Sequence, residues 1–472
     1  MEHIEKQDIQ GLIIKGYSSL PACNFVLLSI KEKANAREWL RKMVPEITAG
    51  SAKPAHSARN IAFTFAGLRA IGLSDDILET FPLELEDGMA TPHKQLFFGD
   101  FGSSSPATWE WGGPQNQTVH ILLMIYASDN TLLSELYQQH KEQFERAGLE
   151  EIKQLDTSVL SERKEHFGFH DGIAQPTIRG LSRADKDENC LPAGEFILGY
   201  KNSYNQYPDT PVAVGKNAEN ILPPAPETAE PDLGKNGSYL VFRQMEQDVA
   251  LFWNYMKNVT TRDGASNPYE MIKLASKMVG RWPGGAPVCL SPDKDDESIK
   301  DTDSFAYRTG DSEGHKCPIA SHVRRTNPRD AFDENKKLSV EIANKHRILR
   351  RGRSYGKPVC ESLAPEDILA STDFEGERGL HFICFNTDIS RQFEFIQNAW
   401  VNNPKLSNLY NERDPIIGNN HHPEDNREMG VFSTPAVGLR KRYTDVPQFV
   451  TIKGGAYFFM PGIRALTYLS SI

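Results

Sequence analysis

Three short segments of the chain bring together residue types that can move protons or bind ions. The first is FGFHDGIAQP at residues 167–176, in which glycines stand on both sides of Asp171. A carboxylate can accept or donate a proton, and flanking glycines let the backbone approach a flat ligand closely or adopt a positive φ. As a bare pattern, however, G-x-x-D-G is also the sequence of an ordinary Asp-Gly turn. Asp171 is therefore a candidate for proton transfer that the pattern alone does not separate from a turn residue.

The second and third segments are rich in positive charge. They are CPIASHVRRTNPRD at residues 317–330 and HRILRRGRSYG at residues 346–356. Between His322 and Arg353 there are ten Lys or Arg residues and four acids, a local balance of +6 in a chain of net charge −10. Such a run is often a solvated surface. Here a histidine, turn residues and an apolar Ile-Leu pair indicate partial burial instead, at a place where anions bind.

Together and in this order, the three segments resemble those of the dye-decolorising peroxidases. By this resemblance Asp171 lies on the distal side of a haem, and His322 matches the axial histidine in the family's A-H-x-R-x-x-N-P-R context. Ser321 stands where the family has alanine, and a small hydroxyl there should not disturb iron ligation. The first arginine of L-R-R-G, Arg350, matches the family's distal arginine. The resemblance implies an enzyme that uses hydrogen peroxide to oxidise bulky organic electron donors such as dyes and phenols.

The resemblance also implies further contacts with the haem. Leu380 and Phe382 match a G-L-x-F segment that packs over the distal pocket. The D-P-I-I-G segment resembles the family element that supplies a carboxylate to the axial histidine, so Asp414 is expected to accept the histidine N–H, with Glu394 as the alternative. The other expected contacts are Gly168, Gly172, Ile173 and Ala174, with Asn327 and Arg329 at the haem propionates.

For the fold, the resemblance extends from about residue 25 to the C-terminus. It implies an α+β protein with duplicated ferredoxin-like domains, each an antiparallel sheet covered by helices, and with the haem mainly in the second. We expect a first domain at residues 1–225, carrying the distal aspartate, and a haem-binding domain at residues 226–472. The implied cofactor is haem b, iron protoporphyrin IX, held non-covalently because the chain has no C-x-x-C-H motif. Length and inserts resemble the larger bacterial subgroup.

Two other function classes are open at this stage. A haem carrier or iron-handling protein could bind porphyrin with little turnover, although a carrier has no need of both Asp171 and Arg350. A zinc enzyme could use His315, Cys317 and His322, whose residue types bind zinc. The spacing of these three residues fits no familiar zinc signature. Absorbance in the Soret region would separate a porphyrin protein from a zinc protein.

Length and composition are those of a globular protein with a large core. The chain has 472 residues, of which 39% are apolar and 25% charged, and it is long enough for two domains. A net charge of −10 argues against nucleic-acid binding. The six cysteines form no C-x-x-C pair and are expected to be free thiols.

The location and assembly of the protein are expectations of the same kind. The first twenty residues contain no visible export signal, and no apolar stretch approaches the roughly 20 residues that span a bilayer. We therefore expect a cytoplasmic protein with no membrane partner. A homodimer is a further expectation.

The elements that must position these residues recur in two halves. Compact apolar runs predict strands, and apolar residues at helical spacing predict helices. In the first half we expect strands at residues 25–30, 61–65 and 119–126, and helices at 34–44 and 131–147. In the second half we expect strands at residues 239–242, 380–385 and 456–460, and helices at 246–256 and 389–400.

The connections help to choose the fold. Residues 204–233 are rich in Pro, Asn, Ala and Glu and predict a linker or long surface loop, and the acidic residues 291–314 predict an exposed excursion. Alternating strands and helices can form a parallel doubly wound sheet, but its dinucleotide-binding form needs a glycine-rich turn after the first strand. No such turn follows residue 30, so a pair of ferredoxin-like units fits better.

Overall fold

The computed structural model describes residues 3–181, 188–422, 427–436 and 438–472. Its centre is one sheet, whose nine strands are β1 (Ala22–Ile30), β2 (Ser57–Phe63), β3 (Ile121–Ala127), β4 (Leu149–Asp156), β7 (Ser238–Gln247), β8 (Leu349–Arg350), β9 (Arg353–Tyr355), β10 (Gly379–Asn386) and β13 (Val450–Met460). The strand order is β4-β1-β3-β2-β13-β7-β10-β8, and β9 also pairs with β10. Every neighbouring pair in this sheet is antiparallel.

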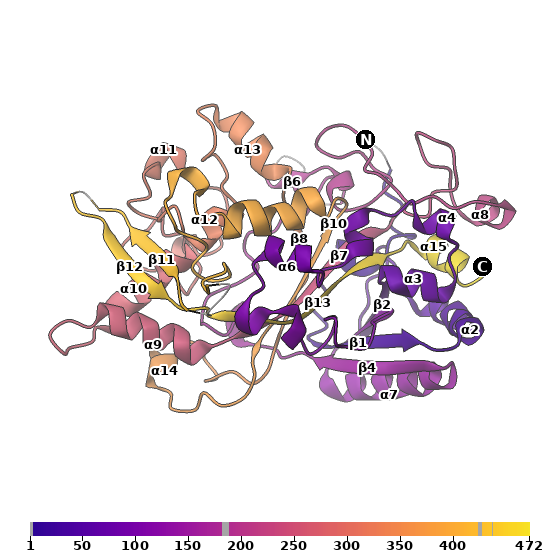
Figure 1. Ribbon diagram of the computed structural model, residues 1–472, viewed down its shortest axis with the longest axis horizontal. Coiled ribbons are helices and arrows are strands. Elements are labelled where there is room, and N and C mark those ends of the chain that lie inside the picture. The colour runs from indigo at the N-terminus through magenta and orange to yellow at the C-terminus, as the bar shows by residue number, and fades with distance from the viewer. Residues whose placement is uncertain (1–2, 182–187, 423–426, 437) are drawn as a thin grey trace.

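The sheet contains the same plan twice. In the first half, α2 (Lys33–Met43) connects β1 to the strand β2 and α7 (Asn130–Arg146) connects β3 to β4. In the second half, α9 (Val249–Thr260) follows β7 as α2 follows β1, and the strand order β13-β7-β10-β8 repeats β4-β1-β3-β2. Figure 1 shows α2 and α7 at one end of the molecule and α9 at the other. The predicted pair of ferredoxin-like units is confirmed, with the addition that β2 and β13 pair and join the two sheets.

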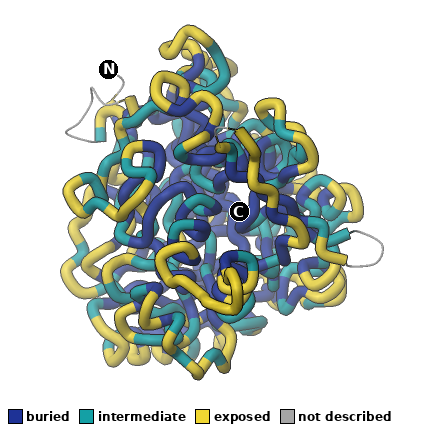
Figure 2. Tube along the Cα trace, turned by 90° about the vertical axis from the view of Figure 1, so that its left-hand side faces the viewer, coloured by how far each residue is buried: buried dark blue, intermediate teal, exposed yellow. Residues whose placement is uncertain are grey.

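The sheet curls, so that strands of its two halves face each other across a shared core. Phe25 of β1 and Phe242 of β7 have ring centroids 5.4 Å apart, although β3, β2 and β13 lie between these strands in the sheet. At the ends of the sheet, the N–H of Ser158 after β4 donates to the carbonyl of Ser354 in β9 at 2.7 Å. Alternate residues of each strand therefore point inward to this core or outward to the helices. Figure 2 shows buried chain through the interior and exposed loops around it.

Each of the ten predicted strands and helices corresponds to an element of the structure. The largest difference at a strand start is β13, which begins at Val450 rather than at residue 456, because Gly454 and Gly455 interrupt its apolar pattern. The strand expected at residues 61–65 ends at Phe63. Thr64 instead caps a helix, since its Oγ1 accepts from the N–H of Gly67 at 3.0 Å.

The spacing of apolar residues in the sequence did not predict the short strands or the strands rich in charged residues. They include β4, which is largely charged, the edge strands β8 and β9, and the hairpin of β11 (Gly430–Thr434) and β12 (Lys441–Val446). The expected loop at residues 204–233 holds only α8 (Lys216–Ile221) among its described residues. The six cysteines are free thiols, as predicted. Within the described ranges, no helix has the length and apolar character needed to cross a bilayer.

The remaining elements are mostly short. The helices are α1 (Gly11–Ile14), α3 (Phe65–Ile71), α4 (Asp75–Leu78), α5 (Leu83–Asp87), α6 (Pro92–Phe98), α10 (Pro268–Val279), α11 (Arg308–Asp311), α12 (His322–Thr326), α13 (Lys336–Asn344), α14 (Pro365–Ala370) and α15 (Ile463–Leu469). The predicted helix after β10 has π-type hydrogen bonds over Ser390–Glu394 and Ile396–Asn402. Two further strands, β5 (Thr177–Ile178) and β6 (Cys190–Leu191), form a parallel pair.

The shared core makes a stability prediction at Phe25, which is fully buried. Phe25→Ala removes its contacts with Phe242 and Tyr126 and should lower the free energy of unfolding by about 3–5 kcal/mol. Equilibrium urea unfolding measures the change. Tyr410→Ala, at an aromatic residue that is 76% exposed, is the control and should stay within about 0.5 kcal/mol. Equal effects of the two substitutions would contradict the shared core.

Candidate active site

His322 is the first residue of α12, and a buried carboxylate holds its ring. His322 Nδ1 lies 2.9 Å from Oδ2 of Asp414, whose side chain is fully buried. The other oxygen of Asp414 accepts from the N–H groups of Ile416 and Ile417 at 2.9 and 3.0 Å. An ionised carboxylate only accepts hydrogen bonds, so Nδ1 carries the hydrogen and Nε2 keeps its lone pair. His322 therefore has a fixed orientation and one nitrogen with the character of a metal ligand.

The electrostatics of Asp414 agree with an ionised carboxylate. Burial raises its pKa, but the interactions with His322 and with the Ile417 N–H outweigh burial, and the pKa lies below its usual value. Glu394, the alternative partner, lies in another cluster and accepts from Tyr457 Oη at 2.8 Å and from Lys94 Nζ. The structure thus brings Asp414, and not Glu394, to His322.

Ser321, which precedes the histidine, does not interfere with it. Its side chain is buried, and its hydroxyl donates to the carbonyl of Lys277. The hydroxyl is therefore satisfied within the protein. This agrees with the expectation that serine can replace alanine at this position.

Asp171 and Arg350 form an ion pair, with 3.1 Å between Oδ1 and Nη1. Burial is the largest influence on the pKa of Asp171 and raises it, but the Arg350 charge and the N–H of Gly172 lower it further, to below the usual value. The side chain of Asp171 is nevertheless 42% exposed. Asp171 is thus largely surrounded by protein and yet partly accessible, which indicates that its carboxylate lines a recess. His322 is also among the groups that lower the pKa of Asp171, which indicates that the two pairs lie in the same part of the protein.

The loop that carries Asp171 is shaped by its glycines and by a buried glutamate. Gly168 and Gly172 have φ values of +96° and +82°, which other residues rarely adopt. A Cβ at Gly168 would lie 2.9 Å from the carbonyl oxygen of Leu363, whereas a Cβ at Gly172 would meet no protein atom within 4 Å. Gly168 thus packs against the protein, and Gly172 leaves room for a ligand. The contact predicted between Gly168 and a haem stays a prediction.

Glu165 braces the loop that leads to Asp171, and the sequence motifs did not indicate it. Its carboxylate accepts from the N–H groups of Phe167 and Phe169, each at 2.9 Å, and from the side chain of Gln247. Burial raises its pKa to about 7. Its charge is coupled to that of Asp171, and it fixes the backbone that leads to Asp171. A carboxylate just before an Asp-Gly loop is the signal that could have identified it.

Strand β10 forms one wall of the site. Leu380 and Phe382 are half-buried although β10 lies between β7 and the edge strands, and they lie on the same face as Cys384. Arg350 in β8 stands directly opposite Cys384. The apolar pair and the distal arginine therefore lie on the same face of the sheet. Ile173 is also half-buried.

Asn327 and Arg329, predicted at the propionates, are both 8% exposed. Arg329 pairs with Asp303 and lies 3.9 Å from the ring centre of Phe305. Asn327 Nδ2 and Arg329 Nε have no hydrogen-bond partner among the described residues. Buried donors of this kind are costly unless they are paired. They are suited to carboxylates at the edge of a ligand.

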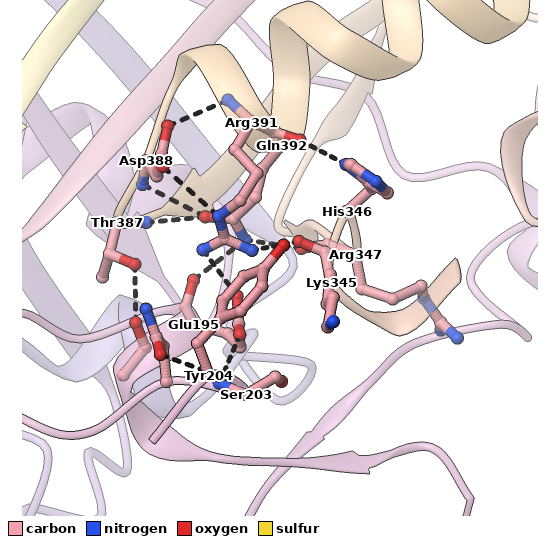
Figure 3. Close-up of polar contacts among 12 residues, drawn as sticks. Glu195, Ser203, Tyr204, Lys345, His346, Arg347, Thr387, Asp388, Arg391 and Gln392 are labelled. Carbon is pink, nitrogen blue, oxygen red and sulfur yellow. Dashed lines mark hydrogen bonds and ion pairs between the residues drawn. The ribbon is translucent and has the colours of Figure 1, made fainter. Parts of the chain in front are cut away.

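The segment before β8 is braced by the helix that follows β10 (Figure 3). Gln392 Nε2 donates to the carbonyl of Arg347 at 2.7 Å and to that of Glu195 at 3.0 Å. Arg391 donates to the carbonyl of Lys345 and pairs with Glu195 at 2.9 Å. Because these contacts fix residues 345–347, they also set the position from which Arg350 extends.

These residues fit a flat, iron-containing ligand with acidic groups at its edge. His322 Nε2 has a lone pair that could bind a metal ion, Gly172 and Phe382 could give backbone clearance and an apolar wall, and Asn327 and Arg329 have donors without partners among the described residues. Ala174 is half-buried and belongs to the same loop as Gly172.

A zinc site fits less well. Within the part of the chain that the structure describes, no three His, Cys, Asp or Glu side chains are grouped as metal ligands. Cys317 is fully buried.

Replacing Arg350 by leucine should raise the pKa of Asp171. The guanidinium charge is the strongest influence that lowers this pKa, and without it burial should move the pKa above the usual value of about 3.9. Infrared difference spectra against Asp171→Asn protein isolate the Asp171 carboxyl band and its titration. An unchanged pKa in Arg350→Leu protein would show that the ion pair does not exist.

The chain also matches known proteins. Residues 213–412 match the family model described as Dyp-type peroxidase, C-terminal. The dye-decolorizing peroxidase of Exidia glandulosa is 28% identical, over 98% of this chain and 87% of that protein. The multifunctional dye peroxidase DyP2 of Amycolatopsis sp. is 28% identical, over 78% of this chain and 74% of that protein.

The fold comparison agrees over the whole chain. The crystal structure of a fungal DyP-type peroxidase from Auricularia auricula-judae superposes with a TM-score of 0.78 and 25% identity, and all of both chains is covered. The sequence relatives, the family model and the fold thus point to one family, whose known members use haem. The chain is thus similar to the DyP-type peroxidases in its family segment, in its sequence and in its fold.

Proposed function

We propose that the chain is a haem b peroxidase in which Asp171 and Arg350 act on hydrogen peroxide and His322 is the axial ligand. The observation that supports this proposal is that the chain forms both the Asp171–Arg350 ion pair and the His322–Asp414 hydrogen bond. Asp171 and Arg350 lie 3.1 Å apart, and His322 and Asp414 lie 2.9 Å apart. The electron donors are bulky organic molecules such as dyes and phenols. The names of the relatives support this, and one solved relative is a complex with 2,6-dimethoxyphenol.

The haem would be held non-covalently by His322 Nε2, by the wall that contains Leu380 and Phe382, and at its edge by Asn327 and Arg329. When bound, the haem iron supplies the redox chemistry that divides the oxygen–oxygen bond of peroxide and takes electrons from the donor. Asp414 accepts the Nδ1 hydrogen of the axial histidine at 2.9 Å, which increases the electron density on the ring and fixes its orientation.

The distal residues handle protons and charge. The carboxylate of Asp171 can accept a proton from one peroxide oxygen and return it to the other, directly or through a water molecule. Negative charge grows on the departing oxygen, and the guanidinium of Arg350 is positioned to stabilise it in a desolvated recess. A haem carrier would need neither function, so the close Asp171–Arg350 pair favours an enzyme over a carrier.

Three further expectations belong to the proposal. The length and inserts of the chain favour the larger bacterial subgroup, although relatives are both fungal and bacterial. The cytoplasmic location and the homodimer also remain proposals based on the sequence. Turnover with hydrogen peroxide across a panel of dyes, phenols and metal ions tests the function as a whole.

Removing the axial ligand should remove the cofactor. His322→Ala should lose most of its haem or the normal Soret band, because no other ring nitrogen is held at this position by Asp414. Haem content by the pyridine haemochrome assay and the absorbance spectrum measure the effect. Full haem content with unchanged ligand-field bands would rule out His322 as the ligand.

Removing the distal charge should stop peroxide activation without loss of the cofactor. Arg350→Leu should keep its haem and react with hydrogen peroxide about 100- to 1,000-fold more slowly at every working pH, because one charge partner of the transition state is lost. Stopped-flow absorbance gives the rate. A wild-type rate would mean that another arginine, such as Arg351 or Arg347, performs this role or that none is needed.

The pH dependence should follow Asp171. Because Arg350 holds the pKa of Asp171 below its usual value, the carboxylate stays ionised, and able to accept a proton, at acid pH values at which a distal histidine would be protonated. Dye oxidation should therefore be maximal at acid pH, and the rate should fall as the pH drops through the pKa of Asp171. Asp171→Asn should change this profile. A maximum above about pH 7 that persists in the variant would exclude Asp171 as the base.

A further inference from the structure

The distal arginine stands at a free edge of the main sheet. β8 is the last strand in the sheet order, and its Arg350 lies opposite Cys384 of β10. The next residue, Arg351, makes the ladder hydrogen bond, from its N–H to the carbonyl of Ile383 at 2.7 Å. In an antiparallel ladder neighbouring residues alternate between bonded and non-bonded pairs. The main-chain N–H and C=O of Arg350 therefore point away from β10, where an edge strand has no partner.

A side-chain amide from the distal loop occupies this edge. The N–H of Arg350 donates to Gln175 Oε1 at 3.2 Å, and Gln175 Nε2 donates to the carbonyl of Arg350 at 3.3 Å. The direction of both bonds is unambiguous, because a main-chain N–H can only donate and a carbonyl can only accept. The amide thus takes the place that a peptide group of a further strand would take. Arg351 Nη1 also donates to the Arg350 carbonyl, at 3.1 Å, but among the described residues only Gln175 accepts from its N–H.

Gln175 and Asp171 belong to the same short loop, four residues apart, so the loop holds Arg350 at two points. Asp171 accepts from the guanidinium at 3.1 Å, and Gln175 binds the main chain from which that side chain extends. The loop, the amide, Arg350 and the ion pair form a closed ring of contacts. A shift of β8 relative to the loop would have to break the amide bonds before it separated the ion pair.

We propose that Gln175 is a positioning residue for the distal pair: its amide binds the main chain of Arg350 and so holds the guanidinium against Asp171. This inference rests on the proposed function, in which both residues of the pair act on peroxide. Gln175 contacts neither reacting group through its own amide, so its effect passes through Arg350. Misplacement of a catalytic group by about 1 Å can cost on the order of 100-fold in rate.

A second glutamine, Gln10, binds a main-chain residue through its amide in the same way as Gln175 and serves as the control. Gln10 makes the same pair of bonds to the main chain of Ile61, with its Nε2 donating to the carbonyl at 2.8 Å and its Oε1 accepting from the N–H at 2.9 Å. Gln10 is fully buried, also donates to the carbonyl of Pro461 and accepts from Asn60, and makes no hydrogen bond to β8 or to the distal loop among the described residues. Methionine is similar in length to glutamine and lacks the amide. Gln175→Met and Gln10→Met therefore remove the same contact at two places.

The test compares these two variants with Arg350→Leu and the wild-type holoenzyme. Gln175→Met should react with hydrogen peroxide about 10- to 100-fold more slowly. The acid limb of its rate profile should move to higher pH, because Asp171 loses the nearby Arg350 charge that lowers its pKa. Gln10→Met should lose thermal stability but keep the wild-type rate and acid limb. A purely structural role of Gln175 would lower stability and leave both kinetic quantities unchanged.

A second measurement does not depend on the loaded enzyme. In haem-free protein, the infrared carboxyl band of Asp171 should titrate at higher pH in Gln175→Met than in wild type, and at the wild-type pH in Gln10→Met. If Gln175→Met does not fold, Gln175→Asn replaces it, because its amide is one methylene shorter and cannot reach both groups of Arg350.

The outcomes separate the two proposals. If Arg350→Leu is slow while Gln175→Met has the wild-type rate and the wild-type Asp171 titration, the inference about Gln175 is wrong and the proposed function stands. If Arg350→Leu itself behaves as wild type in both measurements, the proposed role of Arg350 is wrong.

Discussion

Two hydrogen-bonded pairs of polar side chains have to be held in place at the site. A charge taken out of water is stable in a protein only when it is paired and hydrogen-bonded. Asp171 pairs with Arg350, and His322 with Asp414. The four residues come from four separate parts of the chain, so the elements that carry them cannot shift independently. Much of the surrounding structure fixes the positions of these elements relative to one another.

The curled sheet is the rigid part of this arrangement. The inner core that both halves of the sheet share connects them. On the outer face of the second half lie Leu380, Phe382 and Arg350, which border the site. The halves are also joined by buried charges, since Arg243 of β7 pairs with Asp100 of the first half at 2.6 Å. The site therefore depends on both halves, although most of its residues come from the second. Arg351, next to the distal arginine, donates to carbonyls of the N-terminal segment and ties that segment to the same edge.

The run of basic residues illustrates how differently similar side chains are used. Arg324 and Arg325 in α12 donate mostly to main-chain carbonyls and fix the short helix that presents His322. Arg329 pairs with Asp303, and Arg350 pairs with Asp171. The local excess of positive charge thus serves mainly to hold loops in place, and the distal charge is one member of a larger structural set. A charge count along the sequence does not separate these roles.

Local sequence patterns determined the fold class and the candidates for the site. Apolar spacing identifies the main strands and helices because it depends on neighbours a few residues apart, and the three motifs identify Asp171, His322 and Arg350. The contacts between distant segments were decided only by the tertiary structure. In sequence Asp414 was the expected partner of His322 and Glu394 the alternative, and packing brings Asp414, which is 92 residues away, to its ring. The hydrogen bonds between Gln175 and the edge strand β8 could likewise not be predicted from the sequence. They depend on where the sheet ends and on the path of the loop, and the local spacing of apolar residues contains no information on either.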